Sequence, residues 1–263
     1  MKSIINKSIS VISAGLAFSA IADAQKQNKP NILVFIADDA GMDYGCYGNP
    51  AIQTPNIDAL AASGMRCTKA FLTAPQSSPS RTSMLSGQFA HTIGTEDLHV
   101  GLNDTTKLLT SYLRDAGYYT GLMLKSHIGN NGMKQFDWTD NGWNDWIKGE
   151  WYQKALGYFN EFMDKKGDKP FFLWVAFIDP HRPYEYEPKH NEDVSPKVHD
   201  PAKVLIPPIY VDAPETRKDI ARYYDEIHRM DKYIGLMMAE LKRRKMDENT
   251  LIVYLTDNGM PFP

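Results

Sequence analysis

The chain has 263 residues, 43% of them hydrophobic and 23% charged, so it is long enough to bury the core of one large domain or two small ones. Its formal net charge of -3 gives no overall basic field, which argues against nonspecific binding of nucleic acid. Two cysteines, Cys46 and Cys67, are too few for a disulfide framework and lack the spacing of a zinc site. One disulfide and two free thiols both remain open.

The first 24 residues have the pattern of a signal peptide. Lys2 and Lys7 form a positive n-region, Ile9 to Ala22 form an apolar h-region, and Ala22-Asp23-Ala24 fits the A-x-A cleavage rule. The h-region is shorter than the roughly 20 apolar residues of a membrane span. We therefore expect an exported protein, periplasmic or secreted, with no membrane anchor once the signal is cleaved.

The remaining residues, 25–263, alternate predicted strands with predicted helices. Continuous apolar runs, rich in β-branched and aromatic residues, predict buried strands at 31–37, 118–124, 171–177 and 250–256. Apolar residues at helical spacing and local end signals predict helices at 55–64, 80–87, 105–116, 151–166 and 214–245. This alternation predicts an α/β fold with a parallel or mostly parallel sheet.

Residues with known end preferences set the expected limits of two of these helices. Thr54 is expected to cap the helix that starts at Pro55 and ends at Gly64. Asp104 is expected to cap the helix predicted at 105–116, and Gly117 is expected to end it.

Charged and polar residues directly follow four predicted strands. Ligands of open α/β sheets bind at the carboxyl ends of the strands, so we expect these residues to meet at one edge. They are Asp38 and Asp39, then Lys125 and His127, then Asp179, His181 and Arg182, and last Asp257 and Asn258.

The oxygen-bearing members of this set indicate a metal site. Asp38, Asp39, Asp257 and Asn258 offer hard oxygen ligands without accompanying Cys or His, which favours Ca²⁺ or Mg²⁺ over zinc. A single Asp-Asp pair is more often a solvated loop or a helix cap, but two such groups, each at a strand end, reverse that preference. Asp43 is a weaker candidate, with organisation of the first loop as its alternative role.

Four short motifs resemble the sulfatase family of the alkaline-phosphatase superfamily. The segment Ser77-Ser78-Pro79-Ser80-Arg81, with Leu85-Ser86-Gly87 after it, is similar to the signature C/S-x-P-S-R…L-T-G. K-x-H, P-H-x-P and S/T-D-N-G motifs of the family are matched at residues 125–127, 180–183 and 256–259. The resemblance extends over essentially the whole chain after the signal. It implies a three-layer α/β sandwich around a mostly parallel central sheet.

The resemblance also implies that Ser77 is a precursor rather than the final nucleophile. In this family the residue at that position is oxidised to formylglycine, whose aldehyde hydrates to a geminal diol. A plain serine would be left as a stable alkyl sulfate, whereas the diol expels sulfate when its second hydroxyl is deprotonated. Covalent catalysis of this kind divides one difficult step into two easier ones.

Roles for the other motif residues follow from the same resemblance. A cation, Ca²⁺ in preference to Mg²⁺, would be held by the four oxygen-bearing residues together with residue 77. Arg81 and Lys125 would hold the formylglycine and balance charge. His127 would act as the base, and His181 would contact the sulfate and assist the leaving group.

Three further residues are weaker candidates for substrate binding. His91 and His99 either line the substrate pocket or lie at the surface as packing residues. Arg182 either pairs with substrate anions or forms a structural ion pair.

A serine at position 77, where many family members have cysteine, indicates the serine-type sulfatases. The resemblance then implies a radical-SAM sulfatase-maturing enzyme as a partner. Within the family, residues 204–263 and the segments AFIDPHR and LSGQFAHTIGTEDLH resemble the heparan N-sulfatases. We therefore expect a sulfated sugar as substrate, of glycosaminoglycan type, with N-sulfoglucosamine favoured. An O-sulfatase of different specificity and a phosphodiesterase or phosphonate hydrolase remain alternatives.

The last metal motif lies only a few residues before Pro263, whereas members of the family continue for nearly as long again. We therefore expect residues 25–263 to be an N-terminal catalytic domain in shortened form, without the remaining strands and the smaller C-terminal subdomain. From a different class of function, an inactive fragment or binding remnant is the alternative.

Overall fold

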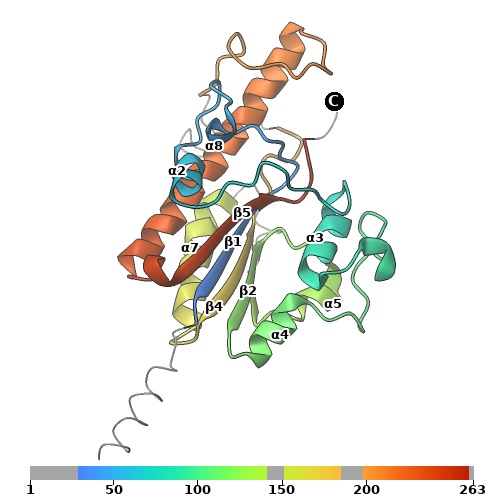
Figure 1. Ribbon diagram of the computed structural model, residues 1–263, viewed down its shortest axis with the longest axis vertical. Coiled ribbons are helices and arrows are strands. Elements are labelled where there is room, and N and C mark those ends of the chain that lie inside the picture. Colours follow the sequence, from blue (N-terminus) through green and yellow to red (C-terminus); the bar gives the residue numbers. More distant parts are fainter. Residues whose placement is uncertain (1–28, 141–150, 185–197, 261–263) are drawn as a thin grey trace, which may run out of the picture. The chain divides into compact units, whose positions relative to one another are not determined.

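The structure is a computed structural model that describes residues 29–140, 151–184 and 198–260 (Figure 1). The expected signal peptide, residues 1–24, lies outside the described residues. The helices and strands of the described residues belong to the compact unit Asn31–Pro263. Within the described segments, no helix combines the length and apolar character that crossing a membrane requires.

A five-stranded sheet with the order β3-β2-β4-β1-β5 forms the centre of this unit. Every strand pairing in it is parallel, which confirms the predicted α/β class. The strands are β1 (Asn31–Ala37), β2 (Tyr119–Leu124), β3 (Trp138–Thr139), β4 (Phe171–Ala176) and β5 (Thr250–Thr256).

The register brings the carboxyl ends of the strands to one edge. Ala176 of β4 lies opposite both Ile36 of β1 and Leu124 of β2, and Ala37 lies opposite Thr256 of β5. The ladder continues past these residues, because Asp257 N–H donates to Ala37 O (3.1 Å) and Lys125 N–H donates to Ala176 O (2.9 Å). The residues that follow each strand are therefore held by backbone hydrogen bonds.

Helices cover both faces of the sheet and make the expected three-layer sandwich (Figure 1). Alternate side chains of β1 point to opposite faces, as the period of a strand requires: Leu33 and Phe35 to one core, Val34 and Ile36 to the other. The first core includes α2 (Pro55–Ser63), α7 (Trp151–Lys165) and α8 (Pro214–Arg243). On the other face lie α3 (Ser77–Ser86), α4 (Leu109–Asp115) and α5 (Gly129–Met133).

Two helices begin at residues other than those predicted. Helix α3 starts at Ser77, three residues before the predicted position near Ser80. Helix α4 starts at Leu109, so the prediction of Asp104 as its cap is wrong. The Asn103 side-chain oxygen instead accepts the Thr105 and Thr106 N–H groups (3.1 and 2.8 Å), and this local turn competes with helix formation.

Several short elements carried no sequence signal. Helix α5 has five residues, two of them glycine, and β3 has only two residues, too few for a periodic pattern. Three 3₁₀ helices, likewise too short for such a pattern, are η1 (Gly45–Tyr47), η2 (Ala90–Thr92) and η3 (Asp247–Asn249).

The start of α2 is capped from another helix, not by Thr54 as predicted. The Thr54 hydroxyl accepts a hydrogen bond from Gly45 N–H (3.0 Å) and donates to Asp58 (3.0 Å). The first-turn N–H groups of α2 are satisfied by the Asp231 carboxylate of α8, which lies 2.7 Å from Ile57 N. The hydrogen bonds of a local N-cap are thus supplied by a residue 174 positions away in the sequence.

Candidate active site

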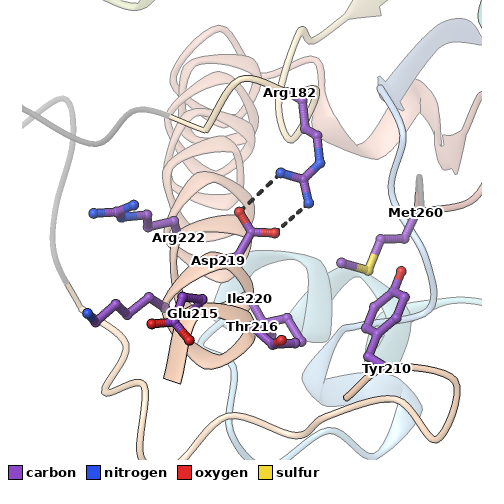
Figure 2. A pocket seen from close by; sticks show the side chains of 9 residues that line it. Arg182, Tyr210, Glu215, Thr216, Asp219, Ile220, Arg222 and Met260 are labelled. Atoms are coloured by element: carbon purple, nitrogen blue, oxygen red, sulfur yellow. Dashed lines mark hydrogen bonds and ion pairs between the residues drawn. The ribbon is translucent and has the colours of Figure 1, made fainter. Parts of the chain in front are cut away.

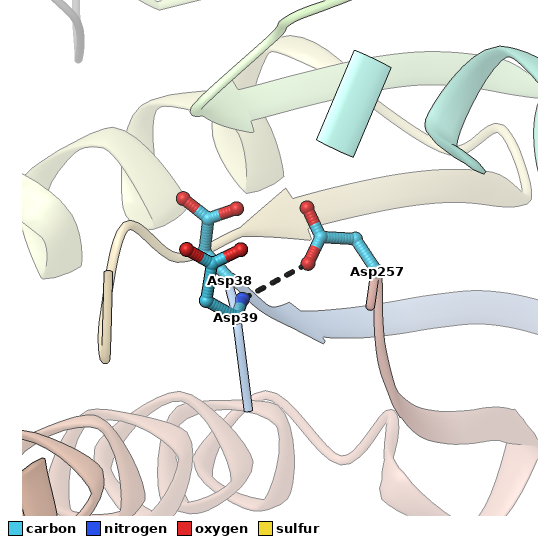
Figure 3. Close-up of side chains that lie close together, drawn as sticks. All are labelled: Asp38, Asp39 and Asp257. Carbon is cyan, nitrogen blue, oxygen red and sulfur yellow. Dashed lines mark hydrogen bonds between the residues drawn. The ribbon is translucent and has the colours of Figure 1, made fainter. Parts of the chain in front are cut away.

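Three carboxylates converge beyond the ends of β1 and β5. Each of Asp38, Asp39 and Asp257 offers an oxygen within 4.8 Å of the others (Figure 3). Asp39 has a left-handed backbone (φ 61°), and its N–H donates to Asp257 Oδ1 at 3.0 Å. Asp38 and Asp257 are fully buried, whereas Asp39 is partly exposed. We call these three residues the carboxylate cluster.

The other two expected metal ligands join the cluster. The Ser77 hydroxyl lies 3.0 Å from Asp38 Oδ1 and 3.3 Å from Asn258 Oδ1. The Asn258 amide nitrogen donates to Asp39 Oδ1 at 2.6 Å, so its oxygen is directed to Ser77. The structure therefore brings together all five residues that the sequence indicated as ligands.

Arg81 and Lys125 supply the positive charge of the site. Arg81 Nε donates to Asp257 Oδ2 (2.9 Å), and its Nη2 donates to Asp38 Oδ1 (3.1 Å). Arg81 lies one helical turn after Ser77 on α3, so both side chains lie on the same face of that helix. The Lys125 ammonium forms an ion pair with Asp38 Oδ2. Arg81 and Asp38 have no exposed side-chain surface.

The two buried carboxylates have opposite pKa shifts. Burial raises the pKa of Asp38, but the charges of Arg81 and Lys125 outweigh it and hold the pKa below its usual value. Burial raises the pKa of Asp257, and the neighbouring Asp38 adds to the rise that Arg81 opposes. Two carboxylates this close repel each other unless a proton or a cation lies between them.

A divalent cation fits this donor set. Three carboxylates face two cationic side chains, which leaves one negative charge uncompensated in a mostly buried site. The donors are all oxygens, the ligands that Ca²⁺ and Mg²⁺ prefer. An acidic cluster of this kind can hold a metal ion. The N-terminus of α3 lies beside it and favours an anionic group there.

Two histidines form a pair beside Lys125. His127 Nε2 lies 2.8 Å from His99 Nδ1, and the rings are 4.8 Å apart between centroids. Burial lowers the pKa of His127 to about 3, with further lowering by the charges of Lys125 and Arg81. His127 is therefore neutral near pH 7 and can accept a proton. The exposed His99 is positioned by its own N–H, which donates to Ser78 Oγ.

His181 approaches the cluster from the loop after β4. Its Nε2 lies 3.7 Å from Asp39 Oδ2, and its ring is partly exposed. His91 is exposed and stacks on Phe89, with ring centroids 5.6 Å apart. Among the contacts of the described residues, none joins His91 to the cluster.

Arg182 lines a pocket at the start of α8 (Figure 2). Its guanidinium grips the Asp219 carboxylate of α8 with two hydrogen bonds, one of them 3.1 Å long, so the structural ion pair considered for it is present. The pocket has a volume of about 480 Å³. It is lined by Arg182, Tyr210, Glu215, Thr216, Lys218, Asp219, Ile220, Arg222 and Met260.

No sequence pattern indicated a functional role for the α8 residues in this pocket or for Arg229, an α8 residue bound to Asp179. Apart from Ile220, these α8 residues are polar and lie at the start or on the buried side of an amphipathic helix, a pattern that surface and ion-pair residues share. Asp179 was noted only for its place after a strand.

Comparisons with known proteins bear on this arrangement. The sulfatase family model matches residues 30–262. Human N-sulphoglucosamine sulphohydrolase is 33% identical over 256 residues, which cover 89% of this chain and 51% of that protein. An arylsulfatase of Klebsiella aerogenes is 27% identical over 336 residues, covering 97% of this chain and 71% of that protein.

A solved structure from Bacteroides thetaiotaomicron, reported with the metabolism of multiple glycosaminoglycans, has the same fold. Its TM-score is 0.70 at 20% identity, with 89% of this chain and 63% of that chain covered. This chain spans about half the length of the human relative. Since the family model covers nearly every residue from 30 onward, the chain belongs to the sulfatase family.

Proposed function

We propose that this chain carries the catalytic centre of an exported sulfatase that acts on a sulfated sugar of glycosaminoglycan type, with N-sulfoglucosamine as the favoured substrate. The observation that carries the proposal is the position of Ser77 at the N-terminus of α3, 3.0 Å from Asp38 and four residues before Arg81. The resemblance to human N-sulphoglucosamine sulphohydrolase supports the substrate. The signal pattern of residues 1–24 supports export.

Ser77 is the residue to be oxidised to formylglycine, by a maturing enzyme of the radical-SAM class. The hydrated aldehyde would supply a nucleophile that can later release sulfate without attack by water on sulfur. Two residues hold the side chain of Ser77 in place. Asp38 and Asn258 contact the Ser77 hydroxyl, and Arg81 Nη2 donates a hydrogen bond to Asp38.

Ca²⁺, with Mg²⁺ as the second choice, is the proposed cofactor. Asp38, Asp39, Asp257 and Asn258 would hold it together with residue 77, and bound there it would supply Lewis-acid chemistry. Arg81 and Lys125 keep Asp38 ionised, which retains it as a ligand. The same two cations and the α3 N-terminus favour binding of a sulfate group.

Two histidines near this centre would move protons. His127 is partly buried beside Lys125 and neutral near pH 7, so it holds no proton that it would have to lose before it acts as a base. An anionic sulfate group bound beside it would raise its pKa toward the operating pH, as a general base requires. His181, partly exposed and 3.7 Å from Asp39, would donate a proton to the leaving group. The pocket next to His181 has room for a sugar and offers charged and aromatic side chains to it.

Sulfate release from matched substrates tests the proposal. The full chain, co-expressed with a radical-SAM sulfatase-maturing enzyme, is assayed on N-sulfoglucosamine, on glucosamine 6-O-sulfate and on glucosamine 6-phosphate, before and after EDTA and with Ca²⁺ restored. We expect release from the N-sulfated sugar, loss with EDTA and recovery with Ca²⁺. Release from the O-sulfated sugar alone would make the protein an O-sulfatase. Turnover of the phosphate alone, or no turnover of any substrate, would overturn the proposal.

A further inference from the structure

An ion pair that the active-site description does not use lies under the loop that carries His181. Arg229 of α8 donates from Nε to Asp179 Oδ2 and from Nη2 to Asp179 Oδ1, both at 2.8 Å. Both side chains are only 4% exposed. The contact is a parallel two-bond fork, the arrangement that fixes a carboxylate both in position and in rotation.

The surroundings of Arg229 hold its guanidinium in place. The Arg229 Cζ lies 4.3 Å from the centre of the Tyr152 ring of α7, and Glu226 Oε1 lies 3.8 Å from its Nη2. Tyr152 and Glu226 are themselves buried. The guanidinium is therefore packed between two helices, which leaves it little freedom to follow a moving loop.

Asp179 connects this anchor to the active site on two sides. Its carbonyl oxygen accepts the N–H of Asp38 at 3.0 Å, directly behind the carboxylate cluster. It also lies inside a turn closed by the His181 N–H, which donates to Ile178 O at 2.9 Å. One side chain, held by Arg229, therefore lies between the backbone of a cluster carboxylate and the backbone of His181.

A gain in stability alone does not explain the buried Arg229–Asp179 ion pair. Removing two charges from water costs about as much as their attraction returns, and well-packed apolar residues of similar volume often stabilise a protein equally well or better. What apolar residues do not provide is the fixed orientation of the fork. The value of the pair therefore lies in the orientation of the turn.

We propose that Arg229 and Asp179 are positioning residues that set the place of His181, and of the Asp38 backbone, relative to the carboxylate cluster. Among the described residues, no hydrogen bond or ion pair joins either of them to the cluster side chains, so we expect them to act through the turn. The kinetic consequence rests on the proposed sulfatase function, whereas the structural consequence does not. A shift of about 1 Å in a catalytic group is enough to lower a rate by up to roughly 100-fold.

The first test separates positioning from stability. Arg229→Met leaves a buried carboxylate without its partner and is expected to lower the melting temperature. The double variant Arg229→Met/Asp179→Leu removes the Asp179 carboxylate as well and is expected to recover the part of that loss that Asp179 causes, while the buried Glu226 still lacks Arg229. In protein with ¹³C-labelled histidine, the His181 ring signal, assigned with His181→Gln, should shift or broaden in the double variant. The signal of His91, which is exposed, should not.

The second test measures sulfate release. We expect Arg229→Lys, which keeps the charge but loses the fork, to lower kcat about 10- to 100-fold with KM changed less than threefold. The stable double variant should be impaired at least as much. Arg217→Lys is the matched control, because Arg217 also forks to an aspartate from α8 but at the surface, with both bonds to Asp212 at 2.6 Å. It should leave kcat unchanged.

A double variant with wild-type melting temperature, wild-type kcat and an unshifted His181 signal would overturn the positioning role and leave the sulfatase function standing. If the wild type releases no sulfate, the proposed function fails, and the His181 signal alone decides. A shifted signal would then support positioning, and an unshifted one would overturn it.

Discussion

The carboxylate cluster with its two cations and the pocket at the start of α8 both consist of opposed charges, yet their surroundings differ sharply. Arg81, Asp38 and Asp257 have no exposed side-chain surface, whereas Arg182 and Asp219 are 32% and 22% exposed. Charges interact strongly out of water and are screened at the surface. Changes in the cluster should therefore act on catalysis and folding, and changes in the pocket only on the binding of substrate.

Loss of Ser77 should have the largest effect. Ser77→Ala removes the group proposed for oxidation, so we expect sulfate release to fall by roughly 10³-fold or more, as for other nucleophile deletions. The carboxylates remain, so Ca²⁺ should still raise the melting temperature, which a thermal-shift assay checks.

Ser80→Ala is the matched control on the same helix. Ser80 is buried, and its hydroxyl has no hydrogen-bond partner among the described residues. This variant should keep wild-type activity. Activity of Ser77→Ala within tenfold of the wild type would contradict the role of residue 77.

Removal of Arg81 should lower the free energy of unfolding. Arg81→Met leaves Asp38 and Asp257 buried without their shared partner, and breaking a buried pair in this way costs about 3–5 kcal/mol. Urea unfolding without added metal measures the loss, and added Ca²⁺ should return part of it. An unchanged free energy of unfolding would show that the cluster is not the charged, buried site described above.

The sequence predicted the cluster well because each of its residues lies in a short motif or directly after an apolar strand. It did not predict contacts that join distant positions. Asp231 caps α2 from 174 positions away, and Arg229 binds Asp179 from 50 positions away. Such pairs leave no local pattern, because each partner alone looks like an ordinary polar residue of an amphipathic helix or loop.

Helix limits were predicted less well than the existence of helices, for a physical reason. Ser77 and Ser78 are polar and continue no apolar pattern, and the helix was predicted to start near Ser80. In the structure α3 starts at Ser77, with Pro79 as its third residue, in the first turn that tolerates proline. The three-residue difference brings Ser77 to the helix N-terminus. The pairing of His99 with His127 also escaped the sequence, because two loops bring them together.

A change of pH should alter the stability of the fold through His127, with an effect smaller than that of removing Arg81. The pKa of His127 is about 3 in the folded chain, below the 6.5 of an exposed histidine. As pH falls below 6.5, the unfolded chain takes up a proton that the folded chain does not, so His127 makes the fold less stable between about pH 6.5 and 3. His127→Gln should therefore lose less stability between pH 7.5 and 5.0, as urea unfolding measures. A steeper loss than in the wild type would contradict this account, and His91→Gln is the exposed control.

The smallest effect is expected in the pocket. Lys218 is exposed and lines it, so Lys218→Ala removes one screened charge. We expect KM for a glycosaminoglycan-derived sulfated sugar to rise about two- to fivefold, with kcat and melting temperature unchanged. A large fall in kcat would remove the distinction between pocket and cluster.

The most direct test of the central claim is the mass of residue 77 in protein produced with a radical-SAM sulfatase-maturing enzyme. Peptide mass spectrometry should find formylglycine there, a loss of two hydrogens from serine, in protein that releases sulfate, and unmodified serine in protein made without the maturing enzyme, which should be inactive. Full sulfatase activity in protein whose residue 77 is entirely serine would contradict the account.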